Sequence, residues 1–185
     1  MISLRKGENT QLDSGLTKII VGLGWNPRVG AGEAFDLDAA CFMLGENERV
    51  RSNADFIFFN QLTSSRGSVR LTGDNLTGEG DGDDEIIFVE LTKVPADVAK
   101  IVFVATIYEA GKRGQNFGMV DDSYIRVVDQ KTNEEIAKFE LMEDACLERS
   151  LIFGELYKRN GAWKFRALGQ GFDGEIRDLA RHYGL

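Results

Sequence analysis

The chain alternates short apolar segments, rich in β-branched and aromatic residues, with clusters of Gly, Asn and Asp. Segments of this kind at spacings of roughly 8–15 residues are typical of strands in an antiparallel sandwich. We therefore predict a mainly β fold, an antiparallel β-sandwich of about ten strands with a C-terminal helix. The predicted strands are Lys18–Trp25, Leu37–Leu44, Asp55–Asn60, Ser68–Thr72, Glu85–Leu91, Lys100–Tyr108, Tyr124–Asp129, Glu134–Leu141, Ser150–Arg159 and Ala162–Gly169.

Two of these segments carry more detail. Asn160-Gly161 separates two alternating runs, which favours a two-residue type I′ hairpin turn. The run from Ile101 to Ile107 is apolar throughout, and such runs suit a strand that is covered on both faces. We therefore expect a helix or a long loop to pack on one outer surface of the sandwich.

One segment, Asp173–Tyr183, predicts a helix. Its apolar residues fall at i, i+3, i+4 and i+7 and form one stripe, Ile176, Leu179, Ala180 and Tyr183. Asp173 is the expected N-cap, and Gly184 follows as a stop signal.

The chain of 185 residues has no internal repeat, no low-complexity linker and no break in composition, so we predict one domain spanning residues 1–185. Hydrophobic residues make up 43% and charged residues 28%, which is ordinary for a globular protein. The net charge is −8, from 22 basic and 30 acidic residues. This balance argues against nucleic acid or an anionic membrane surface as a partner, because both require basic patches.

The sequence shows no pattern typical of a membrane span, a signal peptide or a zinc site. No apolar run reaches the length of a membrane span, and the first residues, Met1–Gly7, lack the apolar core of a signal peptide. We therefore expect a cytoplasmic protein that does not insert into a membrane. The two cysteines, Cys41 and Cys146, and the single histidine, His182, are too few and too scattered for a zinc site.

The stretch Gly73–Glu85 is the chemically distinctive part of the chain, and we call it the acidic stretch. From Asp74 to Glu85 it contains six carboxylates and no cation, and four glycines interrupt it from Gly73 on. Apolar segments flank it on both sides, so it is not a disordered tail. A hard cation is the simplest neutralising partner, and Ca2+ accepts six to eight oxygen ligands in flexible geometry.

The acidic stretch does not fit an EF-hand. Asp74 and Glu85 stand twelve positions apart inclusively, but the third and fifth positions would be Leu76 and Gly78, which lack side-chain oxygens. The glycine position of the motif would be Glu79. We expect instead a loop on a β scaffold, in which glycines let backbone carbonyls approach the ion and binding orders the loop.

A second acidic pair, Asp36 and Asp38, begins a predicted strand and projects from one face of it. The pair is a candidate second wall of the site, and the alternative is a solvated strand edge. Asn60 and Glu109 are further oxygen donors at strand ends, with ordinary turn residues as the alternative.

Several motifs resemble the TerD-type family of tellurium-resistance and general stress proteins over nearly the whole chain. The motifs are Val21-Gly22-Leu23-Gly24-Trp25, Phe35-Asp36-Leu37-Asp38-Ala39, Asp55-Phe56-Ile57-Phe58-Phe59-Asn60-Gln61, the acidic stretch, Phe153-Gly154-Glu155-Leu156-Tyr157 and Trp163-Lys164-Phe165-Arg166-Ala167. The acidic stretch is the most specific of them.

The resemblance implies a β-sandwich that binds Ca2+ at two neighbouring sites. The implied ligands are Asp36, Asp38, Asn60, Asp74, Asn75, Asp81, Asp83, Asp84 and Glu85, with Gly78 and Gly80 contributing backbone carbonyls. It also implies a role in resistance to tellurite and related stress. Other stress-resistance proteins, some of them membrane-associated, are the expected partners of a calcium-ordered scaffold or sensor without enzymatic activity.

Two alternatives come from other functional classes. A metal-dependent hydrolase could hold Mg2+ or Mn2+ in the acidic cluster, but a Ser-His-Asp arrangement would depend entirely on His182, and neither a Gly-x-Ser-x-Gly elbow nor a P-loop is present. A calcium-dependent lectin-like sandwich is compatible with the loop, and the expected cytoplasmic location disfavours it.

Overall fold

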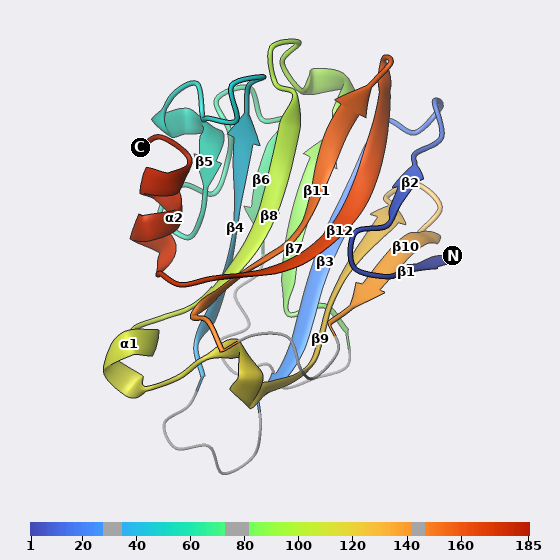
Figure 1. The fold of residues 1–185 in the computed structure, drawn as a ribbon. Helices are drawn as coiled ribbons and strands as arrows, with labels where there is room; N and C mark the ends of the chain where they lie inside the picture. The colour runs from blue at the N-terminus through green and yellow to red at the C-terminus, as the bar shows by residue number, and fades with distance from the viewer. Residues whose placement is uncertain (28–34, 73–81, 142–146) are drawn as a thin grey trace.

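The computed structural model describes residues 1–27, 35–72, 82–141 and 147–185, and within them twelve strands form two six-stranded sheets (Figure 1). The first sheet has the order β1 (Ile2–Leu4), β10 (Glu135–Glu140), β9 (Val120–Asp129), β3 (Lys18–Pro27), β7 (Glu85–Glu90) and β6 (Val69–Thr72). The second has the order β2 (Asn9–Gln11), β12 (Ala162–Phe172), β11 (Ser150–Arg159), β8 (Lys100–Ile107), β4 (Leu37–Leu44) and β5 (Phe56–Ile57).

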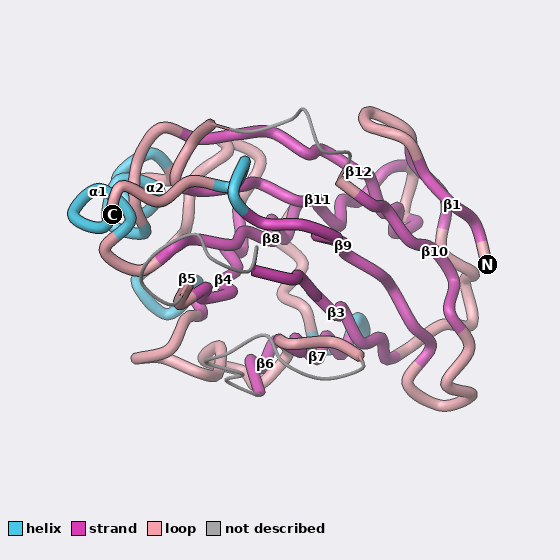
Figure 2. Tube along the Cα trace, turned by 90° about the horizontal axis from the view of Figure 1, so that it is seen from below, coloured by secondary structure: helices cyan, strands magenta, loops and turns pink. Residues whose placement is uncertain are grey.

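The two sheets form the two layers of a sandwich, which Figure 2 shows from below. Among the described strands every pairing is antiparallel except that of β1 with β10. The predicted mainly β sandwich is therefore confirmed. The remaining elements are the helices α1 (Ala110–Arg113) and α2 (Ile176–His182) and the 3-10 turns η1 (Asn53–Asp55), η2 (Leu91–Lys93) and η3 (Phe117–Met119).

The main core lies between the sheets because alternate residues of each strand point inward. On β3 these are Ile19, Val21 and Leu23, none of which exposes any surface. Phe103 and Phe153, from the second sheet, are equally buried in the same cluster. Each such side chain contributes roughly 1.5–3 kcal/mol of burial free energy, so this layer dominates stability.

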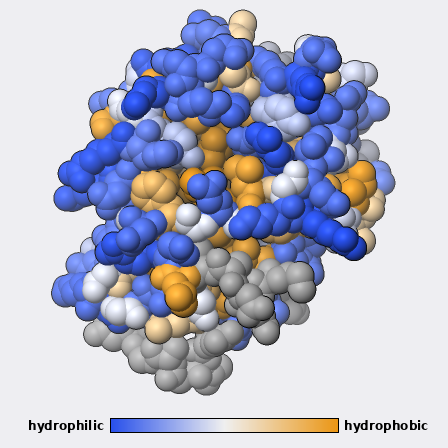
Figure 3. All heavy atoms as spheres, in the orientation of Figure 1, coloured by the Kyte–Doolittle hydropathy of each residue, from blue (hydrophilic) through white to orange (hydrophobic). Residues whose placement is uncertain are grey.

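A second, smaller cluster lies on the outer face of the second sheet. Val102 and Val104 of β8 belong to it, together with Leu179 and Tyr183 from the C-terminal helical segment. The Tyr183 ring lies 4.6 Å from the ring of Phe42 on β4, centroid to centroid. In the view of Figure 3, apolar residues gather in the middle of the molecule with hydrophilic residues around them. The prediction that a helix or a long loop packs on one outer surface of the sandwich is confirmed, and the covering element is the C-terminal helix α2.

Helix α2 has the predicted apolar stripe, but it begins later than expected. Its N-cap is Glu175 rather than Asp173. Glu175 and Asp178 form a capping box, in which the side chain of each residue accepts a hydrogen bond from the backbone N–H of the other. Gly184, with φ of 101°, follows the helix in the left-handed region, as the predicted stop requires.

The predicted hairpin is also confirmed. Asn160 and Gly161 have φ angles of 53° and 77°, the two positive values that a type I′ turn needs. This hairpin lies at the end of the sandwich that we call the far end, together with the loops before β5 and β8.

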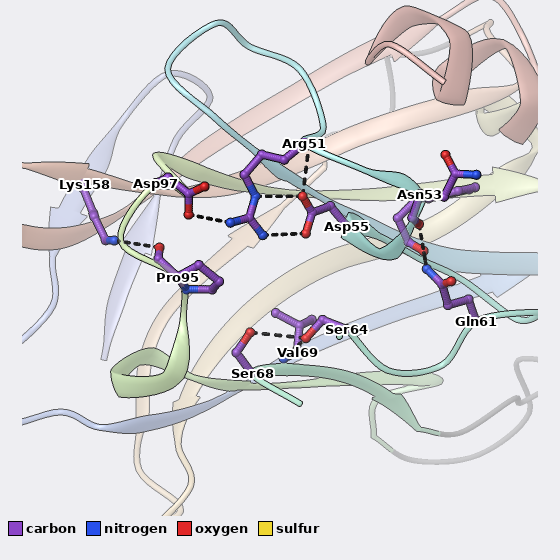
Figure 4. A network of polar contacts seen from close by, with 11 residues as sticks. Arg51, Asn53, Asp55, Gln61, Ser64, Ser68, Val69, Pro95, Asp97 and Lys158 are labelled. Atoms are coloured by element: carbon purple, nitrogen blue, oxygen red, sulfur yellow. Dashed lines mark hydrogen bonds and ion pairs between the residues drawn. The ribbon is translucent and has the colours of Figure 1, made fainter. Parts of the chain in front are cut away.

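A polar network ties the loops of the far end together. Figure 4 shows the Arg51 guanidinium between Asp55 and Asp97. Arg51 Nε and Nη2 donate to the two Asp55 carboxylate oxygens at 2.8 and 2.7 Å, and the Asp55 side chain is 2% exposed. Lys158 Nζ donates to the Pro95 carbonyl at 3.4 Å beside it. The far end is thus closed by charge-assisted hydrogen bonds.

None of the described helices is long and apolar enough to cross a lipid bilayer.

Candidate metal site at the acidic end of the sandwich

The C-terminal end of the acidic stretch and the Asp36–Asp38 pair lie at the same end of the sandwich, at the bottom of Figure 1. Glu85 pairs with Leu23 near the end of β3, and Leu37 pairs with Ile107 at the end of β8. We call this the acidic end. It is opposite the far end, with its Arg51 network.

Asp84 is fixed to β3 by two hydrogen bonds. The β3–β7 pairing ends at Leu23 and Glu85, so Trp25 lies beyond the last residue of β3 that pairs with β7. Trp25 N donates to Asp84 Oδ2 at 2.8 Å, and Asp84 N donates to the Leu23 carbonyl at 2.8 Å. Asp84 is 6% exposed, so its carboxylate is oriented and largely removed from water.

Glu85 follows as the first residue of β7 and is 3% exposed. It alternates with Ile87 and Val89, which are buried in the core, so it lies on the inner face of the first sheet. Two consecutive buried carboxylates are costly unless opposite charge or hydrogen bonds compensate them. Carboxylate oxygens are ligands that Ca2+ accepts, so Asp84 and Glu85 fit a calcium site by donor type.

Asp83 has a different environment. Arg126 Nε donates to Asp83 Oδ1 at 2.8 Å and Arg126 Nη2 donates to Oδ2 at 3.0 Å, a bidentate pair with an Asp83 side chain that is 6% exposed. The Tyr124 hydroxyl lies 2.8 Å from the Gly82 carbonyl oxygen and 3.0 Å from Asp83 Oδ1, so one proton serves two acceptors. We call Asp83, Tyr124 and Arg126 the clamp.

Electrostatics keep Tyr124 and Arg126 each in one protonation state at neutral pH. Burial, and then the negative charge of Asp83, raise the pKa of the Tyr124 hydroxyl, which stays protonated and remains a donor. The hydrogen bonds to Asp83 raise the pKa of the Arg126 guanidinium, which stays charged.

Two glycines of β3 make room for the clamp. A Cβ on Gly22 would lie 2.1 Å from Asp83 Oδ2, and one on Gly24 would lie 2.4 Å from the Tyr124 ring. Gly22 pairs with Arg126, and Gly24 pairs with Tyr124, across the β3–β9 ladder. The Asp83 carboxylate therefore lies across the bare backbone of β3 to reach the next strand.

The other predicted ligands are placed less closely together. Asp38 shares the face of β4 that carries Ala40 and Phe42 of the outer cluster, whereas Glu85 faces the inner core. The Asp36 carbonyl accepts a hydrogen bond from Tyr108 N at 2.7 Å. Asn60 lies in the exposed turn after β5. Glu109, at the end of β8, precedes α1 with φ of 50° and pairs with Lys112 at 3.2 Å.

In the part of the chain that the structure describes, no three carboxylate, histidine or cysteine side chains form a group that could hold a metal. The remaining predicted ligands, Asp74, Asn75, Gly78, Gly80 and Asp81, lie outside the described residues. The described residues thus supply an oriented pair of carboxylates and its support, at the point where the acidic stretch joins β7.

The sequence interpretation did not single out Tyr124, Arg126, Gly22 or Gly24 as parts of the site. One signal for the glycines was present: they occupy alternate positions on one face of a strand that is otherwise apolar, which indicates close approach of another group. Nothing in the local sequence linked Arg126 to Asp83, 43 residues earlier.

The TerD domain matches residues 1–183. The chain belongs to the TerD domain family. Among its relatives, the tellurium resistance protein TerD of Serratia marcescens is 49% identical over 187 residues, covering 100% of this chain and 97% of that protein. General stress protein 16U of Bacillus subtilis is 47% identical over 188 residues, covering 100% of this chain and 97% of that protein.

A solved structure shares the fold. The crystal structure of a homologue of telluride resistance protein from Streptomyces coelicolor superposes with a TM-score of 0.70 at 21% sequence identity, covering 90% of this chain and 96% of that chain. At this identity the likeness concerns the fold alone. Family membership, by contrast, follows from the domain match and from the curated relatives, which are tellurium resistance and general stress proteins.

Proposed function

We propose that this TerD domain protein is a calcium-binding module, without enzymatic activity, that acts in resistance to tellurite and related stress. Two Ca2+ ions bind at the acidic end and order the acidic stretch. The ordered surface then engages partner proteins of the stress response. The observation that carries the proposal is the buried, oriented pair Asp84 and Glu85 at the end of a stretch with six carboxylates and no cation.

The donor set favours Ca2+ over Mg2+. Carboxylates and backbone carbonyls from a glycine-rich loop can provide six to eight oxygens at variable angles, which Ca2+ accepts. Mg2+ demands near-ideal octahedral geometry and gives up its water reluctantly. The alternative of a Ser-His-Asp hydrolase gains no support from His182, whose ring lies 5.4 Å from that of Phe172 and 4.8 Å from that of Tyr183 on α2.

Calorimetric titration of metal-stripped protein tests the site. We expect two Ca2+ ions per chain, and weaker binding of Mg2+. Asp84→Asn and Glu85→Gln each remove one ligand charge and should weaken Ca2+ binding by at least about tenfold. Glu134→Gln is the matched control, because it removes the same charge from an exposed position in the β9–β10 connection at the other end of the strands.

The outcomes separate the candidate functions. Unchanged Ca2+ affinity in both Asp84→Asn and Glu85→Gln would place the site elsewhere. Turnover of a phosphoester with Mg2+ or Mn2+ would favour the metal-dependent hydrolase instead.

The stress role has its own test. Expression of the wild-type chain in a tellurite-sensitive host that lacks its own relative should raise the tellurite concentration that stops growth. The Asp84→Asn, Glu85→Gln double variant should lose that protection while accumulating to the same level. Protection by the double variant would separate resistance from calcium.

A further inference from the structure

We propose that Asp83 is the anchor of the acidic stretch rather than a calcium ligand, and that Tyr124 and Arg126 are positioning residues for the metal site. The inference rests on the proposed calcium binding, because it says how that site is held. It differs from the expectation that all three consecutive acids, Asp83, Asp84 and Glu85, coordinate the ion.

The hydrogen bonds of Asp83 show that its carboxylate is already used. Both oxygens accept from the Arg126 guanidinium, and Oδ1 also lies 3.0 Å from the Tyr124 hydroxyl. Three of the roughly four acceptor positions of a carboxylate are thus filled by protein donors. The Asp83 side chain is 6% exposed, so the carboxylate is held among these donors rather than in water.

The position of the carboxylate also separates it from the other two acids. Asp83 lies over β3 at Gly22, where a Cβ would come within 2.1 Å of it, and it points toward Arg126 on β9. Gly22 and Arg126 pair on the outer face of the first sheet, whereas Glu85 lies on the inner face. The arginine charge beside Asp83 would also repel a second cation at this carboxylate.

An anchor at this position serves the site in a direct way. Asp83 immediately precedes Asp84, whose carboxylate is oriented by Trp25 N. The Tyr124 hydroxyl reaches the Gly82 carbonyl as well, so the clamp holds two consecutive residues at the entry to β7. Holding this backbone fixes the positions of Asp84 and Glu85 before the ion binds. The conformational entropy that Ca2+ binding must overcome is therefore smaller.

Variants that keep the net charge give a test with opposite signs for the two roles. Arg126→Lys keeps the positive charge but loses the bidentate fork, and Tyr124→Phe keeps the ring but loses the hydroxyl. If Asp83 is an anchor, each variant should weaken Ca2+ binding about tenfold while two ions still bind. If Asp83 is a ligand, each variant frees its oxygens, and Ca2+ should bind equally or more tightly.

Arg70→Lys is the matched control. Arg70 is on β6 of the same sheet, and its guanidinium carbon lies 4.9 Å from the Phe88 ring centroid. Arg70→Lys therefore makes the same arginine-to-lysine exchange in this sheet at a residue outside the clamp. Its Ca2+ affinity should equal that of the wild type. Asp83→Asn should also weaken binding about tenfold with two ions retained, and combining it with Arg126→Lys should add no further loss.

Calorimetry and thermal unfolding in EDTA are measured together, so that a folding defect is recognised. Tyr124→Phe, the mildest change, should unfold cooperatively in EDTA at a midpoint a few degrees below the wild type. Unchanged or tighter Ca2+ binding in Arg126→Lys and Tyr124→Phe, or loss of one ion in Asp83→Asn, would overturn the anchor. Absence of Ca2+ binding in the wild type would instead overturn the proposed function, and the anchor's role with it.

Discussion

Gly22 lies directly beneath the Asp83 carboxylate, and its missing side chain is what lets that carboxylate reach Arg126. Gly24 does the same for the Tyr124 ring. A glycine in a strand interior normally weakens the strand, because it packs nothing and has more conformational freedom to lose. Here the two glycines leave a shallow depression, which we call the seat, on the outer face of β3, and the Asp83 carboxylate and the Tyr124 ring occupy it.

This arrangement predicts that Gly22→Ala lowers the free energy of unfolding by about 1–3 kcal/mol, since the new methyl group displaces a hydrogen-bonded carboxylate. Urea unfolding in EDTA measures the change. In an Asp83→Ala background the same substitution should be tolerated much better. Gly15→Ala is the control, because at this exposed position the new Cβ would meet the Asp13 carboxylate at 3.1 Å rather than 2.1 Å; it should cost clearly less than Gly22→Ala. Equal effects at positions 15 and 22 would contradict the seat.

Cys41 is a second residue whose behaviour follows from its surroundings. It has no exposed surface, and burial raises the pKa of its thiol. Since only the thiolate reacts, and a raised pKa lowers the thiolate fraction at every pH below it, native Cys41 should resist thiol reagents. In a Cys146→Ser chain, Ellman's reagent should react with Cys41 only on the timescale of unfolding and rapidly in guanidinium. Rapid reaction in the native state would show that the core is open at β4.

At the level of elements, helix α2 packs on the outer face of the second sheet. Its stripe packs on the outer faces of β4 and β8, and Leu179 is fully buried there. Without the helix, the outer face of strands that are apolar on both sides would meet water. The helix therefore contributes packing to the outer face of the second sheet.

Leu179→Ala should lower the free energy of unfolding by about 2–5 kcal/mol, the range for truncating a buried leucine side chain. Arg177→Ala, an exposed change on the same helix, should stay within about 0.5 kcal/mol. Denaturant unfolding followed by tryptophan fluorescence compares the two. Similar small effects would show that α2 does not cover the sheet.

Much of the element pattern could be predicted from the sequence, because hydrophobic period and turn chemistry are local. β4 and β11 have the predicted bounds, and the Asn160-Gly161 turn was identifiable from two residues. The segments β1 and β2 were missed because three-residue edge strands carry too little apolar pattern. β5 is shorter than the predicted Asp55–Asn60, since a 3-10 turn ends at Asp55 and the Phe58–Gln61 turn begins directly after it.

The site was predictable only in part, for the opposite reason. The acidic composition of the acidic stretch is visible in the sequence, and it is the reason to propose a divalent cation there. The partners of Asp83 are set by the β7–β3–β9 pairing, which brings residues 43 positions apart into contact. Periodicity assigns faces to strands, but it does not say which strands are neighbours.

At the scale of the whole molecule, the two ends of the sandwich have different roles. The far end is closed by the Arg51 network, in which a buried carboxylate is paired within the protein. The acidic end gathers carboxylates beside the entry to β7. The Arg51 network and the clamp share no residue, so we expect a substitution in one to leave the contacts of the other in place.

Asp55→Asn should therefore lower the free energy of unfolding by about 3 kcal/mol, because it leaves Arg51 without its buried partner. Asp97→Asn removes a partner that is 72% exposed and should change stability by less than about 1 kcal/mol. Both variants should bind Ca2+ as the wild type does, which calorimetry checks. A large loss of Ca2+ affinity in the folded Asp55→Asn chain would show that the ends are coupled.

The most direct test of the central claim is the thermal unfolding midpoint of metal-stripped wild-type protein as a function of Ca2+ concentration. If Ca2+ binds the folded chain as proposed, the midpoint should keep rising with the logarithm of free Ca2+ above the dissociation constant. Mg2+ at the same concentrations should give a smaller rise, and EDTA should reverse both. A midpoint that is the same in EDTA and in a large excess of Ca2+ would contradict the calcium site at the acidic end.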